Sequence, residues 1–472
     1  MADRFPDSAN GVAAGRQWNV NDVALPSSAR SSFAGRVVFV MFSAVLLPPL
    51  LLWQAWNTAS ERYRHWLLTA FMTVYGSTIG IGFTPGMRDG PDGVRHLYSA
   101  YTRYVDMSLG EFLDGVWNIL TLTRGDHQQD LYIHALSYFV SGVLGMPGLF
   151  FTFVAFVYGY FFAGSLVIAL RGWRSVQLPI ITLLLVVTFL LMKNLEGVNT
   201  VRTWTGLWVL VYACLRYHET GRWRYILLMA CPPFIHIGWT IMVIPAFVVI
   251  VFGSRPVLYS ALFFASSLTT FLPSGALEAQ FNRTEVGAQM MRGYLRDAPI
   301  DTAAATAAIL THGTGGTRIW RALRNAGVQK WALNLFVLTL VASGVYLLSM
   351  TAFQQKIFSI GLLMITLSNS MWFISALSNR AWVAGAVFIG LGFIMWRLAQ
   401  GNQLRVPLMR GLYPVGMALS MLLFLPYLAF NASTFLDFPS VFLLGLPVAV
   451  WFEPDINMSI KEALRFFLLS IM

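Results

Sequence analysis

The stretch NTVRTWTGLWVLVYACLRYHETGRWRYILLMACPPFIHIGW, residues 199–239, determines how the chain is organised. Arg202 heads one apolar helix, a basic turn follows at 216–224, and a second apolar helix ends at His236. A charged side chain at membrane depth costs about 3 kcal/mol, so it is retained where it is paired or functional. Because short turns rich in Lys and Arg stay in the cytoplasm, we expect the 216–224 turn inside and both Arg202 and His236 at the outer face.

Composition places the chain in a membrane. Of its 472 residues 57% are hydrophobic and only 11% are charged, whereas a soluble domain carries about a quarter charged residues. The apolar runs predict an all-α polytopic membrane protein with about 11–14 transmembrane or re-entrant helices. They are too long and too uniformly apolar for the alternating strands of an outer-membrane barrel.

Charge and cysteine content exclude other classes. The net charge of +11 arises between hydrophobic spans, where it suits cytoplasmic loops and anionic lipid headgroups, so we expect no nucleic-acid partner. Cys214 and Cys231 lie inside predicted spans and are expected to be packing residues. No metal-ligand spacing is visible, so neither a metal nor another cofactor is predicted.

The predicted organisation has three parts. Residues 1–35 form a polar, disordered tail without the apolar core of a cleavable signal peptide, 36–455 form one integral membrane domain, and 456–472 form a short amphipathic segment. The polar segments 84–130 and 273–329 are too charged to span. Alternating the sides of successive turns places both segments outside as periplasmic loops, provided that residues 131–145 turn back without crossing completely.

Several segments then resemble a known family. They are Val201-Arg202-Thr203-Trp204 with Phe234-Ile235-His236, Met87-Arg88-Asp89-Gly90-Pro91-Asp92 followed by Tyr98, the tract 130–145 beginning Asp130-Leu131-Tyr132, and Ser378-Asn379-Arg380. In their order and expected topology they resemble the EpsG/Wzy-type polysaccharide polymerases, which make O-antigen or exopolysaccharide, over about residues 60–400.

The resemblance implies a multi-pass enzyme of the bacterial inner (cytoplasmic) membrane with a GT-C-like glycosyltransferase architecture. It would join undecaprenyl-diphosphate-linked oligosaccharide repeat units at the periplasmic face, alongside a flippase and a chain-length regulator. A diphosphate leaving group needs fixed positive charge, which arginine supplies with two-point hydrogen bonds. The acceptor hydroxyl needs a carboxylate or imidazole base.

The candidate site residues follow from these requirements. The predicted catalytic residues are Asp92, Glu196 and His236, and those predicted to bind diphosphate or sugar are Arg88, Tyr98, Arg202, His312 and Arg380. Each has a structural alternative. The arginines could anchor the chain at the lipid headgroups, His236 could satisfy backbone groups freed by the neighbouring prolines, and the loop residues could simply be solvated.

Other functional classes remain open. Another lipid-linked glycosyltransferase or an O-antigen ligase would use the same groups. A transporter would need acidic residues inside the spans, and the span centres contain almost none. A non-enzymatic scaffold would not need arginines gathered at one face.

A last prediction concerns how the lipid reaches the site. If residues 131–145 turn back, they should leave a lateral gap near the outer leaflet through which an isoprenoid tail reaches the site.

Overall fold

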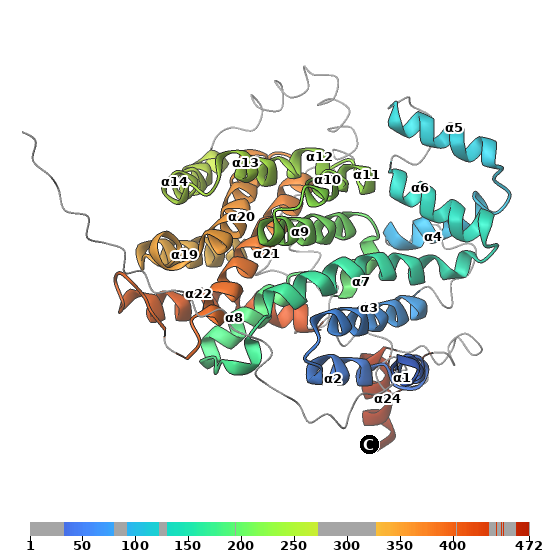
Figure 1. The fold of residues 1–472 in the computed structure, drawn as a ribbon, viewed down its shortest axis with the longest axis horizontal. Helices are drawn as coiled ribbons and strands as arrows, with labels where there is room; N and C mark the ends of the chain where they lie inside the picture. The colour runs from blue at the N-terminus through green and yellow to red at the C-terminus, as the bar shows by residue number, and fades with distance from the viewer. Residues whose placement is uncertain are drawn as a thin grey trace, which may run out of the picture.

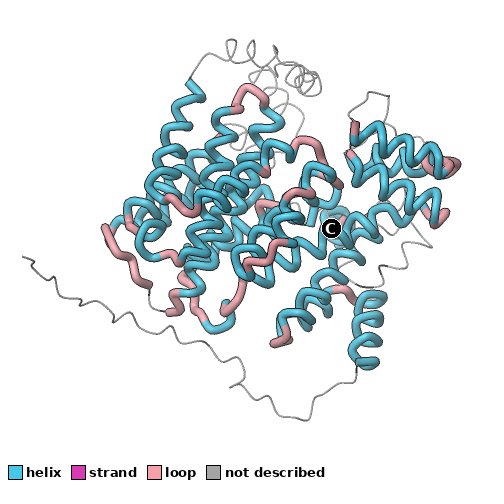
Figure 2. The backbone as a smooth tube through the Cα atoms, turned by 45° about the horizontal axis from the view of Figure 1, so that its top comes forward, coloured by secondary structure: helices cyan, strands magenta, loops and turns pink. Residues whose placement is uncertain are grey.

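The computed structural model describes residues 33–79, 92–121, 130–193, 195–271, 327–402, 404–433 and 459–471, together with positions 440, 445 and 447. Every element with assigned bounds in these ranges is a helix, and short loops connect them (Figure 2). The predicted all-α class is therefore confirmed for the described chain. Most of the predicted loop 273–329 lies outside the described residues, as does most of the predicted tail, whereas the predicted loop 84–130 is described except at 84–91 and 122–129.

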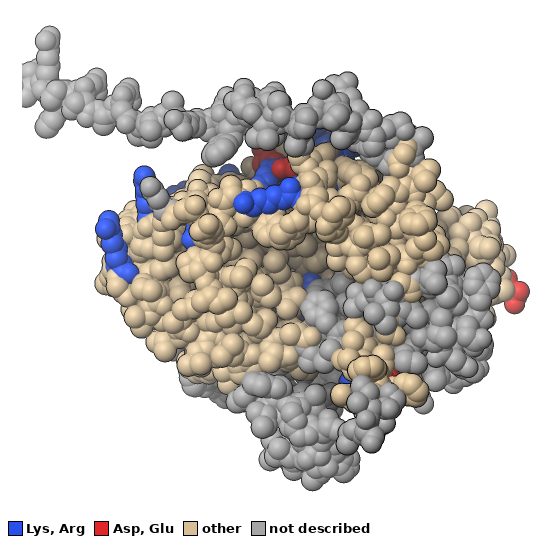
Figure 3. All heavy atoms as spheres, turned by 90° about the horizontal axis from the view of Figure 1, so that it is seen from below, with Lys and Arg blue, Asp and Glu red and all other residues tan. Residues whose placement is uncertain are grey.

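Three described helical segments are long and apolar enough to cross a membrane, namely Pro147–Ser175, Ala376–Ala399 and Leu412–Ala432. Seven shorter apolar helices accompany them. Figure 3 shows a broad face whose described side chains are mostly uncharged, with Lys and Arg gathered near its margins. These features support a membrane protein, while the expected total of about 11–14 spanning or re-entrant helices stays a prediction.

Of the three N-terminal helices, α3 packs against α7 (Phe150–Ala169), and the other two pack against α3. The three are α1 (Phe33–Leu46), α2 (Pro49–Asn57) and α3 (Glu61–Thr78), and the break between α1 and α2 falls at Pro48-Pro49 (Figure 1). Glycine permits the close approach of α3 to α7, because a Cβ on Gly76 would lie 2.2 Å from the Cβ of Ala155.

The central helix is α9 (Thr203–Thr220), which is buried at every position from Thr203 to Leu215. Its predicted partner helix is instead a series of short helices: α10 (Arg224–Met229), α11 (Pro232–Ile235), α12 (Trp239–Met242) and α13 (Ile244–Phe252), followed by α14 (Pro256–Ser267). Prolines cause most of these breaks, since each lacks an N–H and clashes with the preceding turn. The Trp239 indole N–H donates to the Thr203 carbonyl at 3.0 Å and so ties α12 to the head of α9.

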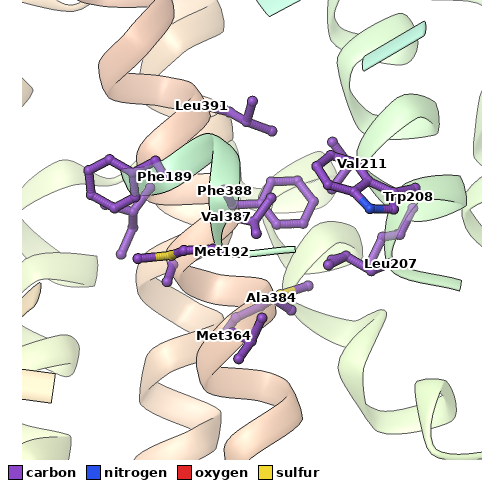
Figure 4. Packing of buried hydrophobic residues seen from close by; sticks show 14 of the residues in the cluster. Phe189, Met192, Leu207, Trp208, Val211, Met364, Ala384, Val387, Phe388 and Leu391 are labelled. Carbon is purple, nitrogen blue, oxygen red and sulfur yellow. The ribbon is translucent and has the colours of Figure 1, made fainter. Parts of the chain in front are cut away.

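The C-terminal half packs around α9 through α20 (Ala352–Ser370) and α21 (Ser375–Ala399), two helices in close contact at Gly361 and Gly385. The helices α8 (Ile180–Leu191), α19 (Val328–Ala342) and α22 (Leu412–Ser433) complete this half. In Figure 4, Val387 and Phe388 of α21 lie between Phe189 near the end of α8 and Trp208 of α9. This shared apolar core packs the middle of α21 between α8 and the first half of α9.

The helices α4 (Asp92–Thr102), α5 (Leu109–Leu120) and α6 (Leu131–Tyr138) form a separate group at one side of the molecule (Figure 1). Helix α5 lies within the predicted loop 84–130 and begins with a capping box between Ser108 and Glu111. Its apolar side chains Leu109, Leu113 and Trp117 are exposed, which suits a helix lying on a membrane surface. The amphipathic C-terminal segment is likewise helical, as α24 (Ile460–Ile471).

The tract predicted to turn back consists of α6 and the π-helix η3 (Phe139–Val143), eight and five residues long. Together they rise roughly 20 Å, which is short of the roughly 30 Å hydrocarbon core of a bilayer. The chain then turns at Gly145, where φ is +66°, and continues through Pro147–Leu149 into α7. This length agrees with a half-span, and the lateral gap beside it stays a prediction.

Candidate functional site

A buried carboxylate, Asp130, joins three distant segments of the chain. It is the N-cap residue of α6 and only 1% exposed. One carboxylate oxygen accepts the backbone N–H of Ile237 at 2.9 Å, and the other forms an ion pair with Nη1 of Arg202. The Nδ1 atom of His236 lies 3.3 Å from both oxygens. Since a buried charge must be paired and hydrogen-bonded to be tolerated, these contacts account for its burial.

Local backbone geometry presents Arg202 to this carboxylate. The 3-10 helix η6 (Leu195–Thr200) leads into Val201, which has φ +47° and is fully buried. A β-branched residue in this left-handed region is strained by about 1–3 kcal/mol, and such strain gathers at functional sites. Arg202 follows as the N-cap residue of α9.

His236 is placed by the C-terminal end of α11, a four-residue helix that begins with Pro232 and Pro233. It ends α11 in an extended conformation, with φ −157° and ψ 123°, so the chain leaves the helix and its imidazole is buried. The next backbone N–H, that of Ile237, is then directed at Asp130.

Arg380, on the first turns of α21, completes the cluster. Its Nη1 donates to Nε2 of His236 at 2.8 Å. Because a guanidinium is always protonated and has no acceptor, Nε2 must carry the lone pair, which puts the imidazole proton on Nδ1, facing Asp130. These four residues, which are linked in the order Arg202–Asp130–His236–Arg380, form the Asp130 cluster.

Two opposing effects set the charges in the Asp130 cluster. Burial alone would raise the pKa of Asp130, but the hydrogen bond from His236 and the charge of Arg202 outweigh it and hold that pKa at about 2. Burial also lowers the pKa of His236 below its usual value, although Asp130 opposes this. At neutral pH the cluster therefore holds two guanidinium cations, one carboxylate and a neutral imidazole, a net charge of one positive unit.

A further cation lies close to the Asp130 cluster in the chain. Lys193 follows α8, and its ammonium group lies 4.2 Å from the ring centroid of Trp204, two residues after Arg202. A cation over an indole face is stabilised by the ring quadrupole. The turn that leads into Arg202 therefore carries one lysine, Lys193, and one glutamate, Glu196.

Three of the eight predicted site residues meet here: Arg202, His236 and Arg380. Tyr98 lies half-buried on α4, a helix that packs against η6 just before Arg202. Asp92 starts α4 and Glu196 lies within η6, and only the backbone of these two residues is described. Arg88 and His312 lie outside the described residues.

The residue that sequence reasoning missed is Asp130, the centre of the cluster. The acidic residue was visible as the end of the 84–130 polar loop, directly before the apolar tract 131–145. That position mirrors Arg202, a charged residue directly before an apolar helix. The resemblance also includes Asp130 as the first residue of the tract 130–145, but Asp130 was not among the predicted site residues.

One turn along α6 from Asp130, a polar cavity of about 590 Å³ opens beneath α5. Its wall includes His134, which is held by the Tyr104 hydroxyl at 2.9 Å and the Phe112 carbonyl at 3.0 Å. Burial raises the pKa of Tyr104 to about 12, so its hydroxyl keeps its proton. The remaining lining residues are mostly polar or acidic: Arg103, Asp106, Met107, Glu111, Asp114, Gly115 and Asn118.

Comparison with protein-family models, with curated protein sequences and with solved structures found no match. Within the described residues, no group of three or more His, Cys, Asp or Glu side chains is placed to hold a metal ion. The function is therefore inferred from the chemistry of the Asp130 cluster and its surroundings.

Proposed function

We propose that this chain is an inner-membrane glycosyltransferase that polymerises undecaprenyl-diphosphate-linked oligosaccharide repeat units at the periplasmic face. The observation that carries the proposal is the Asp130–His236 pair, which is flanked by Arg202 and Arg380 at the ends of buried helices. The cluster provides a base and two arginines for an anionic leaving group within one small volume.

The two arginines supply the binding chemistry for the diphosphate. Arg202 pairs with Asp130, and Arg380 donates to a neutral imidazole. Diphosphate oxygens, being anionic, are stronger acceptors for Arg380 than the imidazole nitrogen is. A bound diphosphate would therefore draw Arg380 away from Nε2 of His236, and Arg202 could contact it with donors that it does not use on Asp130.

That exchange would prepare the base. Once Arg380 has moved, Nε2 of His236 accepts the proton of the acceptor hydroxyl. At the same time, the oxygen of that hydroxyl forms a bond to the anomeric carbon of the donor sugar. The bond between that carbon and the diphosphate oxygen breaks, and the diphosphate leaves with the electron pair against the arginines. Asp130 holds the Nδ1–H tautomer and stabilises the imidazolium that forms, as the carboxylate of a His–Asp pair does.

The polar cavity beneath α5 offers a place for the sugars. Its volume of about 590 Å³ lies within the usual range of ligand pockets, and carboxylates and amides are suitable acceptors for sugar hydroxyls. It shares α6 with Asp130, at a separation of about one helical turn through His134. An oligosaccharide bound there would reach the Asp130 cluster without leaving the outer face. The proposal also includes a GT-C-like architecture for the chain and, as its partners, a flippase and a chain-length regulator.

Substitution of Arg202 tests the proposal. In a strain that lacks the native gene, Arg202→Ala should reduce chain extension about 100-fold or more, the usual loss when a transition-state donor is removed. Arg202→Lys should restore it only in part, because lysine keeps the charge but loses the two-point contact. Polysaccharide length on gels is the measurement, with membrane content of the protein as the folding check.

Arg222→Ala is the matched control, because Arg222 is exposed and lies in the basic turn that follows α9. It should leave the polymer unchanged. Normal long-chain polymer from membrane-inserted Arg202→Ala protein would contradict the assignment.

A further inference from the structure

A second cavity, of about 440 Å³, lies where α3, α7 and α9 meet. It lies beside Arg216, 14 residues along α9 from Arg202, so the helix separates it from the Asp130 cluster by roughly 21 Å. It is therefore a different site. Its lining includes Glu61, Arg62, His65, Trp66, Tyr160 and Arg216.

The two carboxylates at this end of the molecule are already held by arginine. Arg171 binds Glu61 with two hydrogen bonds, at 2.7 and 2.8 Å, and also pairs with Glu219. Glu219 receives a second arginine, Arg216, at 3.0 Å. These ion pairs fix the rim of the cavity. Both glutamates are engaged in them, and the arginines still outnumber the glutamates.

Three arginines lie in or beside the cavity against two glutamates, which leaves one positive charge uncompensated; the arginines are Arg62, Arg171 and Arg216. Arg62 is exposed and Arg216 is partly exposed, with 32% of its side chain accessible. Guanidinium groups of this kind bind phosphate oxygens bidentately.

Aromatic side chains form the rest of the wall. The His65 Nε2 is anchored on the Tyr160 carbonyl at 2.6 Å, and Trp66 remains 46% exposed beside the opening. Exposed tryptophan next to cationic side chains is typical of the headgroup level of a membrane. An exposed apolar ring at the opening offers a surface for acyl chains, which a site for a small soluble anion would not require.

We propose that this cavity binds the phosphate of an anionic phospholipid headgroup, with Arg62 and Arg216 on the phosphate and the chains leaving past Trp66. Loops rich in arginine are retained in the cytoplasm, so this lipid would belong to the cytoplasmic leaflet. The site is independent of the proposed polymerase reaction, and its lipid would brace α3, α7 and α9 at their common end.

Native mass spectrometry of the purified full-length chain tests the proposal. Phosphatidylglycerol and phosphatidylcholine are added separately at equal concentration, and the apparent affinity of the first bound lipid is measured. We expect tighter binding of phosphatidylglycerol, and Arg62→Gln should weaken it about fivefold, the factor that corresponds to about 1 kcal/mol for one membrane-surface arginine. Arg62→Gln/Arg216→Gln should weaken it further.

Arg222→Gln is the matched control and should change the affinity less than twofold, since Arg222 does not line the cavity. Because Arg62 is exposed, Arg62→Gln should fold, and gel filtration checks this. Inorganic phosphate at millimolar concentration is added as a competitor. Retention of phosphatidylglycerol supports a lipid site, whereas its displacement would assign the cavity to free phosphate. Equal binding of the two lipids, or equal effects of Arg62→Gln and Arg222→Gln, would overturn the proposal.

Discussion

Replacement of Asp130 by asparagine should remove the electrostatic stabilisation of the Asp130 cluster while keeping its shape. The carboxyl has a pKa of about 2 in place of 3.8, and each pKa unit corresponds to about 1.4 kcal/mol, so its interactions stabilise the fold by about 2 kcal/mol. Asp130→Asn also deprives Arg202 of its carboxylate. Breaking a buried pair costs about 3–5 kcal/mol, and because 23% of the Arg202 side chain is accessible, we expect a total near 3 kcal/mol.

The sign of the pH dependence follows from the lowered pKa. The stabilisation by Asp130 is complete above about pH 3.8, the usual pKa of an aspartate, and is lost as the pH falls towards 2, where the folded-state carboxyl becomes protonated. Wild type should therefore remain the more stable protein from pH 7 to pH 5, and the difference should grow as His236 is protonated, because Asp130 favours the charged imidazole. The difference should shrink only in stronger acid.

The assay is reversible unfolding in mixed micelles, with wild type, Asp130→Asn, Arg202→Gln and the double variant compared at pH 7. We expect the double variant to be less destabilised than the sum of the single variants by about 1–3 kcal/mol, the range for residues in direct contact. Asp106→Asn is the control, because Asp106 is exposed and should change stability by less than about 0.5 kcal/mol. Equal stabilities of wild type and Asp130→Asn, or strictly additive effects, would refute the reasoning.

Two further predictions concern packing and topology. Gly76→Ala places a methyl group 2.4 Å from the Phe151 carbonyl oxygen and should destabilise the protein by about 1–3 kcal/mol. Gly110→Ala is the control, because the nearest neighbour of its methyl group lies 3.9 Å away, and it should change the unfolding free energy little. Similar losses of stability in both variants would contradict the α3–α7 contact. Cysteines introduced within 84–130 and 273–329 should react with a membrane-impermeant maleimide in intact cells, and labelling only after permeabilisation would reverse the predicted topology.

Local sequence predicts those parts of the fold that depend on a single segment. The long apolar tracts become α7, α20 and α21, and α5 forms where its apolar spacing predicts a helix. The tract 225–252 differs, since it contains four short helices in place of two longer ones. The prolines mark such breaks, but the direction that the chain takes after each break depends on what it packs against.

The Asp130 cluster illustrates the same limit. Arg202, His236 and Arg380 were predicted from the cost of charge near apolar helices and from the expected alternation of sides. Asp130 lies 72 residues from Arg202 and 106 from His236, and a contact at such separation depends on tertiary packing of α6 against α11. The sequence shows which segments carry charge, whereas only the fold shows which charges meet.

The accessibility of the Asp130 cluster indicates which of its members a ligand would meet first. The Asp130 side chain is fully buried and that of His236 is 6% accessible, while the Arg202 side chain keeps 23% of its surface. Partial exposure lowers the desolvation cost of the Arg202 guanidinium, and it also leaves that cation within reach of a ligand. Here the cation is the accessible member and the carboxylate lies behind it, so an approaching anion meets Arg202 before it meets the negative charge. This polarity is what binding of a diphosphate requires, and a site for a cation would need the opposite order.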